Sequence, residues 1–160
     1  KMAEDDRLLK MQTEYQLQAL LASNQETDTY GLCLSREDAQ MLLCEQKNIL
    51  QKQRRIDFGG GILQKLISVF CDSPYFLQES YAEDLQRLSE IFYLYKNESL
   101  DELTDDELLS YMKEKFDGEC GGDMDYLEGT ALAEFAREIR SRTRKYIGRY
   151  RADAEGFHGK

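Results

Sequence analysis

The segment from Asp117 to Glu128 is ordered like a calcium-binding loop. It has aspartate at position 1, glycine at 6, a hydrophobe at 8, aspartate at 9 and glutamate at 12, as in helix–loop–helix calcium sites. Position 3 is Glu119, whose side chain is long for a tight loop, and position 5 is Gly121, which offers no side-chain ligand. Because two ligand positions are damaged and no second loop pairs with this one, we expect a glycine-rich helix corner without metal. The candidate ligands are Asp117, Asp123, Asp125 and Glu128.

Paired carboxylates on helices can hold magnesium, but the pairs in this chain lack the required spacing or position. A helical Mg²⁺-dependent nucleotide pyrophosphatase carries Glu-x-x-Glu on one helix and Glu-x-x-Asp on another. Glu79 and Glu83 are one residue too far apart for this pattern. Glu98 and Asp101 have the spacing but lie near a predicted helix start, where acids serve as caps and favour the helix dipole. Since a metal cage needs both halves, we expect no cofactor.

A run of three glycines, Gly59–Gly61, interrupts the chain before an apolar segment. Glycines ahead of a helix let backbone N–H groups approach an anion at the positive helix end. The run lacks the Gly-x-x-x-x-Gly-Lys-Ser/Thr spacing of a phosphate-binding loop, and no predicted strand precedes it. A tight corner between two helices is the preferred interpretation. The alternative, a small-anion or nucleotide site, would use Arg55, Asp57, Gly59, Gly60, Gly61, Lys65 and Asp72.

The C-terminal segment is strongly basic, although the chain has a net charge of −10. Residues 137–151 contain seven basic residues and one acid around an apolar stripe. Such a helix could bind RNA, an anionic surface or an acidic partner helix, or it could dock on the acidic surface of its own chain. The surplus of acid elsewhere favours docking and argues against nucleic acid as the partner. The candidate contact residues are Arg142, Lys145 and Arg149.

Residues 78–97 are predicted to form a helix with a heptad-like seam. The seam residues are Tyr81, Leu85, Leu88, Phe92 and Tyr95. Tyr93 and Leu94 follow Phe92 directly, so apolar side chains occupy more than one face of this helix. One face can be buried in a core, and the surplus would form an exposed patch. We therefore expect Tyr93 and Leu94 to contribute to a homodimer or to a groove for a protein partner.

Helices must position all of these candidate residues. The chain has a single proline and no tryptophan, and scarce proline argues against an all-β fold with many turns. Ser35 and Thr104 are each followed three residues later by an acid, which is a capping pattern. Apolar residues recur at helical spacing in about six segments: 4–22, 35–55, 61–71, 78–97, 104–117 and 124–150. The sequence predicts an all-α bundle of about six helices, in which the nearly all-apolar segment 61–71 is central.

Length, cysteines and hydropathy predict a single-domain cytoplasmic protein. A chain of 160 residues suits one domain, whose ends at 1–3 and 152–160 are expected to be disordered. No apolar run approaches the ~18 residues of a membrane span, and the acidic N-terminus does not resemble a signal peptide. The four cysteines form no Cys-x-x-Cys pair, and Cys44 and Cys71 are expected to be buried thiols in a reducing compartment. The only histidine, His158, lies in a tail that cannot hold a catalytic base in place.

Four short motifs resemble an uncharacterised family of small cytoplasmic proteins of Firmicutes-type bacteria. They are Tyr30-Gly31-Leu32 with Asp38-Ala39, Arg55-Ile56-Asp57-Phe58-Gly59-Gly60-Gly61-Ile62, Phe70-Cys71-Asp72-Ser73-Pro74-Tyr75, and Ile91-Phe92-Tyr93 with Lys96-Asn97-Glu98-Ser99. The resemblance spans about residues 30–137. It implies a bacterial, cytoplasmic setting. Because the family has no assigned activity, it brings no catalytic residue with it.

The function predicted from these observations is non-catalytic binding. No constellation in the sequence supplies a complete nucleophile, base or metal cage. We expect a cytoplasmic interaction protein that binds a protein partner or a second copy of itself, without contact to a membrane. The alternative is a metal- or nucleotide-dependent enzyme, or a small-anion-binding protein, that uses the corner at Gly59–Gly61.

Overall fold

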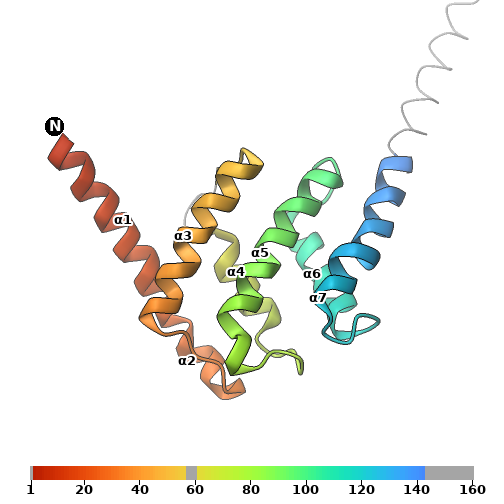
Figure 1. Ribbon diagram of the computed structural model, residues 1–160, viewed down its shortest axis with the longest axis horizontal. Coiled ribbons are helices and arrows are strands. Elements are labelled where there is room, and N and C mark those ends of the chain that lie inside the picture. Colours follow the sequence, from red (N-terminus) through yellow and green to blue (C-terminus); the bar gives the residue numbers. More distant parts are fainter. Residues whose placement is uncertain (1, 57–60, 143–160) are drawn as a thin grey trace, which may run out of the picture.

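The structure is a computed structural model that describes residues 2–56 and 61–142. These residues form helices joined by short turns, with no β-strand among them, so the predicted all-α bundle is confirmed. The elements are α1 (Met2–Ala22), α2 (Asn24–Thr27), η1 (Asp28–Tyr30), α3 (Arg36–Gln53), α4 (Gly61–Phe70), η2 (Gln78–Ser80), α5 (Tyr81–Glu98), α6 (Asp105–Asp117), α7 (Met124–Tyr126), η3 (Leu127–Ala131) and a last helical stretch at 132–142. Figure 1 shows α1, α3, α5 and the last stretch side by side, with α4 and α6 behind them.

Local hydrogen bonds begin the helices where the sequence predicts. The Ser35 hydroxyl accepts the Asp38 N–H at 3.0 Å, which begins α3 with a reciprocal capping box. The Thr104 hydroxyl and the Glu107 carboxylate form the same arrangement at the start of α6. These donors would otherwise lack partners, because the first turn of a helix has no preceding carbonyls. Both helix starts are therefore set by side chains three residues away.

The core is one continuous cluster of buried residues that runs from α1 to the last helical stretch. Helix α5 contacts α3, α4 and α6, and it buries one side chain or more on every turn. Aromatic rings fill the space between α4, the following loop and α6: Phe70, Phe76 and Phe116 lie with centroids 5.7–5.8 Å apart. Edge-to-face and offset contacts of this kind add to the hydrophobic stabilisation. This aromatic cluster belongs to α4, the loop after it and α6, and Figure 1 shows α4 and α6 behind α3 and α5.

The predicted apolar helix is α4, and it lies behind α3 and α5. Its buried residues are Ile62, Leu63, Leu66, Ile67 and Phe70. Lys65 and Ser68 are exposed, so one narrow face of the helix meets solvent. Tyr75, in the loop after α4, covers the corner between α6 and α7, where Gly122 has φ +83°. A Cβ at Gly122 would lie 2.5 Å from the Tyr75 ring, so this corner requires glycine.

Several local features differ from the predictions. Between the helices expected at 4–22 and 35–55, the chain forms two further short helical turns, α2 and η1. Cys44 is exposed rather than buried, because it lies on the solvent side of α3. The helix expected over 124–150 begins as predicted but widens into a π-helical turn, η3. Its residues from 143 onward lie outside the described part, as does the predicted disordered tail at 152–160.

Helix α1 is covered along only part of its length. Leu17 and Leu20 are 2% and 1% exposed and join the core. Toward the N-terminus, α1 diverges from α3 and leaves the row of helices (Figure 1). The uncovered part of α1 therefore lies beside the packed bundle rather than within it.

No described helix is both long and apolar enough to cross a membrane.

Candidate functional site

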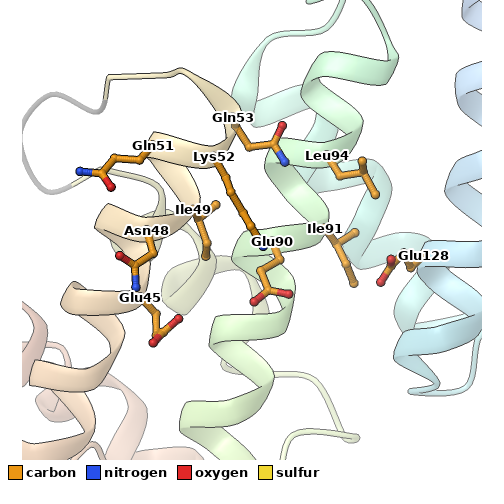
Figure 2. Close-up of a pocket in the computed structure, with 10 residues that line it drawn as sticks. All are labelled: Glu45, Asn48, Ile49, Gln51, Lys52, Gln53, Glu90, Ile91, Leu94 and Glu128. Atoms are coloured by element: carbon orange, nitrogen blue, oxygen red, sulfur yellow. The ribbon is translucent and has the colours of Figure 1, made fainter.

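A groove with a volume of about 760 Å³ runs over the face formed by α3, α5 and η3. Cavities of roughly 300–1,000 Å³ are the usual size of binding sites. Figure 2 shows the groove residues, with α3 on one side, α5 in the middle and Glu128 at the far end. They are Glu45, Asn48, Ile49, Gln51, Lys52, Gln53, Glu90, Ile91, Leu94 and Glu128. All lie in the described part of the chain, and only Leu94 and Glu128 were candidates from the sequence.

The floor of the groove is rigid because it belongs to the core. Ile49 is 7% exposed and Ile91 is 1% exposed. Beside them, the Ser89 hydroxyl donates to the side-chain oxygen Oε1 of Gln46 at 2.5 Å. The side-chain Nε2 of Gln46 in turn donates to the Tyr93 hydroxyl at 3.3 Å. Buried polar groups that satisfy one another fix the relative position of the helices that carry them. This buried link therefore holds α3 and α5 at a set separation.

The rim of the groove is polar and carries more acids than bases. Glu90 is exposed and Glu45 is half-buried, and within the described residues neither forms an ion pair or a side-chain hydrogen bond. Lys52 is the only cation among the lining residues. Leu94 of α5 adds a half-buried apolar side chain on the side of the groove toward Glu128 (Figure 2). The groove thus offers two carboxylates that form no ion pair with a described residue, Glu45 and Glu90, and one apolar contact point.

One end of the groove is formed by the π-helical turn η3. The Leu132 N–H bonds to the Leu127 carbonyl, five residues back, so the turn is wider than an α-helical one. The Tyr95 hydroxyl donates to the Glu128 carbonyl, which secures the widened turn against α5. Burial, followed by the charge of Glu128, raises the pKa of Tyr95. Because π-helical turns occur frequently at functional sites, η3 is a second feature that marks this face.

Arg87 neutralises part of the acid at this end of the groove. Its Nη2 lies 2.7 Å from the Glu128 carboxylate and 2.9 Å from that of Asp125. Hydrogen bonds to Glu128 and then Asp125 raise the pKa of Arg87, so its charge is fixed. Two of the four candidate calcium ligands are therefore engaged by an arginine from another helix.

The other two calcium candidates face elsewhere. Asp117 accepts the Ser73 hydroxyl at 2.6 Å and pairs with Lys113 at 2.7 Å. Asp123 caps α7 through the N–H groups of Asp125 and Tyr126. Within the described residues, no group of three or more His, Cys, Asp or Glu side chains is placed to hold a metal ion. The segment forms the glycine-rich helix corner preferred from the sequence.

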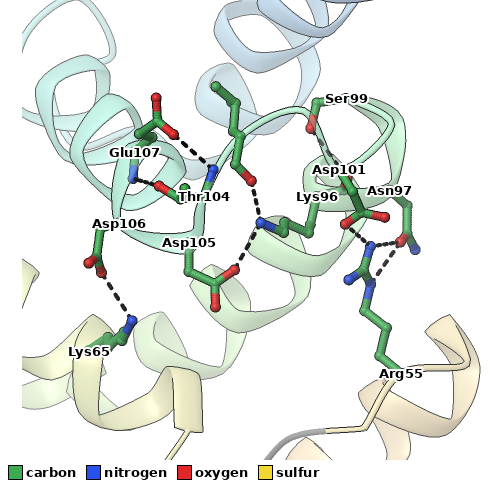
Figure 3. A network of polar contacts seen from close by, with 11 residues as sticks. Arg55, Lys65, Lys96, Asn97, Ser99, Asp101, Thr104, Asp105, Asp106 and Glu107 are labelled. Atoms are coloured by element: carbon green, nitrogen blue, oxygen red, sulfur yellow. Dashed lines mark hydrogen bonds and ion pairs between the residues drawn. The ribbon is translucent and has the colours of Figure 1, made fainter.

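The residues around Gly59–Gly61 do not converge where they are described. Arg55 donates to Asn97 at 2.8 Å and pairs with Asp101 at 2.7 Å, whereas Lys65 pairs with Asp106 at 3.1 Å (Figure 3). Asp72 pairs with Lys113 at 2.8 Å, away from both of these contacts. Gly61 begins α4, and Asp57, Gly59 and Gly60 lie outside the described residues.

The contacts in Figure 3 connect three helices around the loop between α5 and α6. Lys96 pairs with Asp105 at 3.0 Å and donates to the Leu103 carbonyl. Leu100 and Asp101 both have positive φ, at 58° and 56°, so the loop turns sharply. Arg55, which follows α3, and Lys96 of α5 bind this strained loop at Asp101 and Leu103, whereas Lys65 of α4 pairs with the start of α6. These contacts give the three cations a structural role.

The predicted partner-binding residues separate into buried, half-buried and exposed groups. Tyr93 is 6% exposed, so it is not part of the exposed patch expected from the sequence. The reason is that α3 covers this side of α5, which the spacing of apolar residues could not indicate. Leu94 remains accessible in the groove. Arg142 is exposed, and its Nη2 lies 3.7 Å from the Glu138 carboxylate. Lys145 and Arg149 lie outside the described residues.

The described thiols and amines with shifted pKa values are not prepared for catalysis. Burial, then the charge of Asp72, raises the pKa of the Cys71 thiol, and burial raises that of Cys120. A thiol needs a lowered pKa to act as a nucleophile near neutral pH. Burial lowers the pKa of Lys113, but hydrogen bonds to Asp117 and Asp72 outweigh it, so the amine stays protonated. Ser73 therefore has no neutral amine beside it to act as a base.

Comparison with known families supports one part of the resemblance seen in the motifs, namely that the family is uncharacterised. Residues 19–145 match a family of unknown function, DUF6323, and the chain belongs to this family. No curated protein and no solved structure matches the chain. The groove residues all fall within the matched range, whereas most of α1 precedes it.

Proposed function

We propose that this member of the DUF6323 family is a non-catalytic binding protein whose α3–α5 groove takes a basic segment of a partner protein. The observation that carries the proposal is the groove itself, with an apolar floor and the unpaired carboxylates of Glu45 and Glu90 on its rim. Opposite charge on the two surfaces would select the partner and speed their encounter. The net charge of −10 acts in the same direction over a longer range.

An extended cationic partner fits the spread of the acids better than a single ion does. Glu45, Glu90 and Glu128 come from three different elements, and they are not gathered into a metal-binding group. Lysine or arginine side chains spaced along a helix can each reach one carboxylate, and an apolar residue between them can contact Leu94. Helices that dock in grooves present their anchors at such helical spacing. A short amphipathic helix with basic flanks is therefore the proposed ligand.

The alternative, an anion or nucleotide site at Gly59–Gly61, has less support. Its described cations, Arg55 and Lys65, are engaged by Asn97, Asp101 and Asp106. We also propose that the protein forms a single domain and is located in the cytoplasm of a bacterium, as the resemblance implies. Free thiols at Cys33 and Cys44, both exposed, are consistent with a reducing compartment.

Binding of defined peptides tests the proposal. The probe is a labelled amphipathic helical peptide with lysines flanking a leucine stripe, and the matched control peptide has glutamate at every lysine position. Fluorescence anisotropy should detect binding of the lysine peptide to the full chain and none of the glutamate peptide. The double variant Glu45→Gln/Glu90→Gln should weaken binding about fivefold, given about 0.5 kcal/mol for each exposed charge pair.

A second pair of exposed acids provides the control for net charge. Glu26 and Glu134 are exposed and lie outside the groove, so Glu26→Gln/Glu134→Gln changes the net charge equally. This control should bind the lysine peptide as tightly as the unaltered chain does. Equal losses in the two double variants would mean that the whole acidic body attracts the peptide, and the groove proposal would be wrong.

A further inference from the structure

Three large apolar side chains on α1 are uncovered. Leu8 is 58% exposed, Met11 is 68% exposed and Tyr15 is 76% exposed. Their spacings of three and four residues place them on one face, which we call the α1 stripe. This face is distinct from the one that buries Leu17 and Leu20 in the core. Contiguous apolar surface on a soluble protein commonly marks an interaction site.

The spacing of the α1 stripe is that of a coiled-coil seam. With Leu8 and Tyr15 as a positions, Met11 occupies the d position between them. The flanking g positions are then Arg7 and Glu14, which have opposite charge. Within one chain, the Glu14 carboxylate lies 3.2 Å from Arg36 in an exposed ion pair. When two such helices run antiparallel, g positions lie beside g positions, so Arg7 of each copy would approach Glu14 of the other. In a parallel pair Arg7 would face the uncharged Gln12 instead.

From this pattern we infer that the α1 stripe pairs antiparallel with the α1 stripe of a second copy, which makes the protein a homodimer. An antiparallel pair has a two-fold axis near Met11, so each stripe covers the other with one self-complementary surface. Leu8 of each copy then packs against Tyr15 of the other. Two symmetrical Arg7–Glu14 contacts border the seam. Because each must share Glu14 with Arg36, they favour this orientation over the parallel one by a small margin.

The position of the stripe also suits two highly acidic bodies. Each copy carries a net charge of −10, so close contact between the bundles would be repulsive. The stripe lies on the part of α1 that diverges from the bundle (Figure 1). Pairing there joins the two copies away from the packed bundles, which reduces this repulsion.

The paired surface is small, so the dimer is weak. Stable interfaces bury about 1,200–2,000 Å² in total, and three side chains from each copy supply less than this. Dimerisation is therefore expected only at high protein concentration. Sedimentation equilibrium over a range of concentrations measures it directly with the full chain.

Substitution of the stripe tests the inference. Met11→Asp should weaken dimerisation at least about tenfold, since it places an unpaired charge between two apolar surfaces. Leu77→Asp is the matched control, because Leu77 is 58% exposed, as Leu8 is, but lies in the loop after α4. That variant should dimerise normally. Circular dichroism should be unchanged in both, since neither side chain is part of the core.

Disulfide cross-linking tests the orientation. In a background with serine at the accessible thiols Cys33, Cys44 and Cys71, Met11→Cys should cross-link to itself. Leu8→Cys should cross-link with Tyr15→Cys when the two variants are mixed, and neither should cross-link alone. Self-linking at all three positions would show a parallel pair and overturn the antiparallel assignment. A strict monomer at the highest soluble concentration would overturn the inference entirely.

Discussion

The α3–α5 groove and the α1 stripe are both uncovered, but they differ in how they are built. The groove has a floor of core residues and a rim of carboxylates, so charge dominates what it can recognise. The α1 stripe has exposed apolar side chains on a helix that leaves the bundle, so desolvation dominates its interactions. One molecule thus presents two surfaces that different physical forces would drive, and each force responds differently to substitution, pH and salt.

Substitutions of one large residue in each region should have the most unequal effects. Ile91→Ala, in the groove floor, should lower the free energy of unfolding by about 3 kcal/mol, because a buried side chain leaves a cavity. Met11→Ala should change it by less than about 0.5 kcal/mol, because the side chain is already in water. Urea unfolding at low protein concentration measures both values. Equal losses of unfolding free energy in Ile91→Ala and Met11→Ala would show that this part of α1 is packed against the bundle in solution.

High pH should destabilise the bundle that supports the groove. Burial raises the pKa of Tyr81 to about 12, from the usual 10.0 of a tyrosine in water. The folded state favours the protonated phenol, so its contribution is complete below pH 10 and is lost as the pH rises toward 12. The loss should reach about 2 kcal/mol by urea unfolding. In Tyr81→Phe, which keeps the ring, this part of the pH dependence should disappear, and its persistence would assign the effect to other groups.

Salt should act in opposite directions on the two surfaces. Raising the salt concentration screens the carboxylates of the groove and should weaken lysine-peptide binding by up to about fivefold, for the two contacts of Glu45 and Glu90 at about 0.5 kcal/mol each. The same salt screens repulsion between two acidic chains and should strengthen dimerisation through the α1 stripe. Titrations by anisotropy and by sedimentation in the same buffers compare the two. Parallel changes would show that one force governs both surfaces.

The smallest expected effect concerns Arg87. Because Arg87 pairs with Glu128, Arg87→Met frees a carboxylate at the end of the groove. The lysine peptide should then bind about twofold tighter, as expected for one exposed charge pair. Dimerisation through α1 should not change, since Arg87 lies on α5. Weaker peptide binding would indicate that Arg87 is needed to position η3.

Local signals in the sequence were sufficient for the helices and most of their ends. Ser35 and Thr104 cap their helices by bonding to residues three positions away, and three positions are visible in any short window. The same holds for Asp123, which caps α7. The π-helical turn η3 had one weak signal, Gly129, because a glycine disfavours a regular helix. Its secure form depends on Tyr95, which lies 33 positions earlier.

The sequence by itself determined which segments are helical, whereas only the tertiary structure decided which faces are covered. Phe92 and Met11 both belong to apolar patterns of helical spacing, yet Phe92 is 1% exposed and Met11 is 68% exposed. Likewise, Glu128 is spaced as a calcium ligand but is bound by Arg87, 41 positions away. Helical spacing is set by the backbone within one or two turns, but burial and ion pairing depend on what the fold places opposite each side chain.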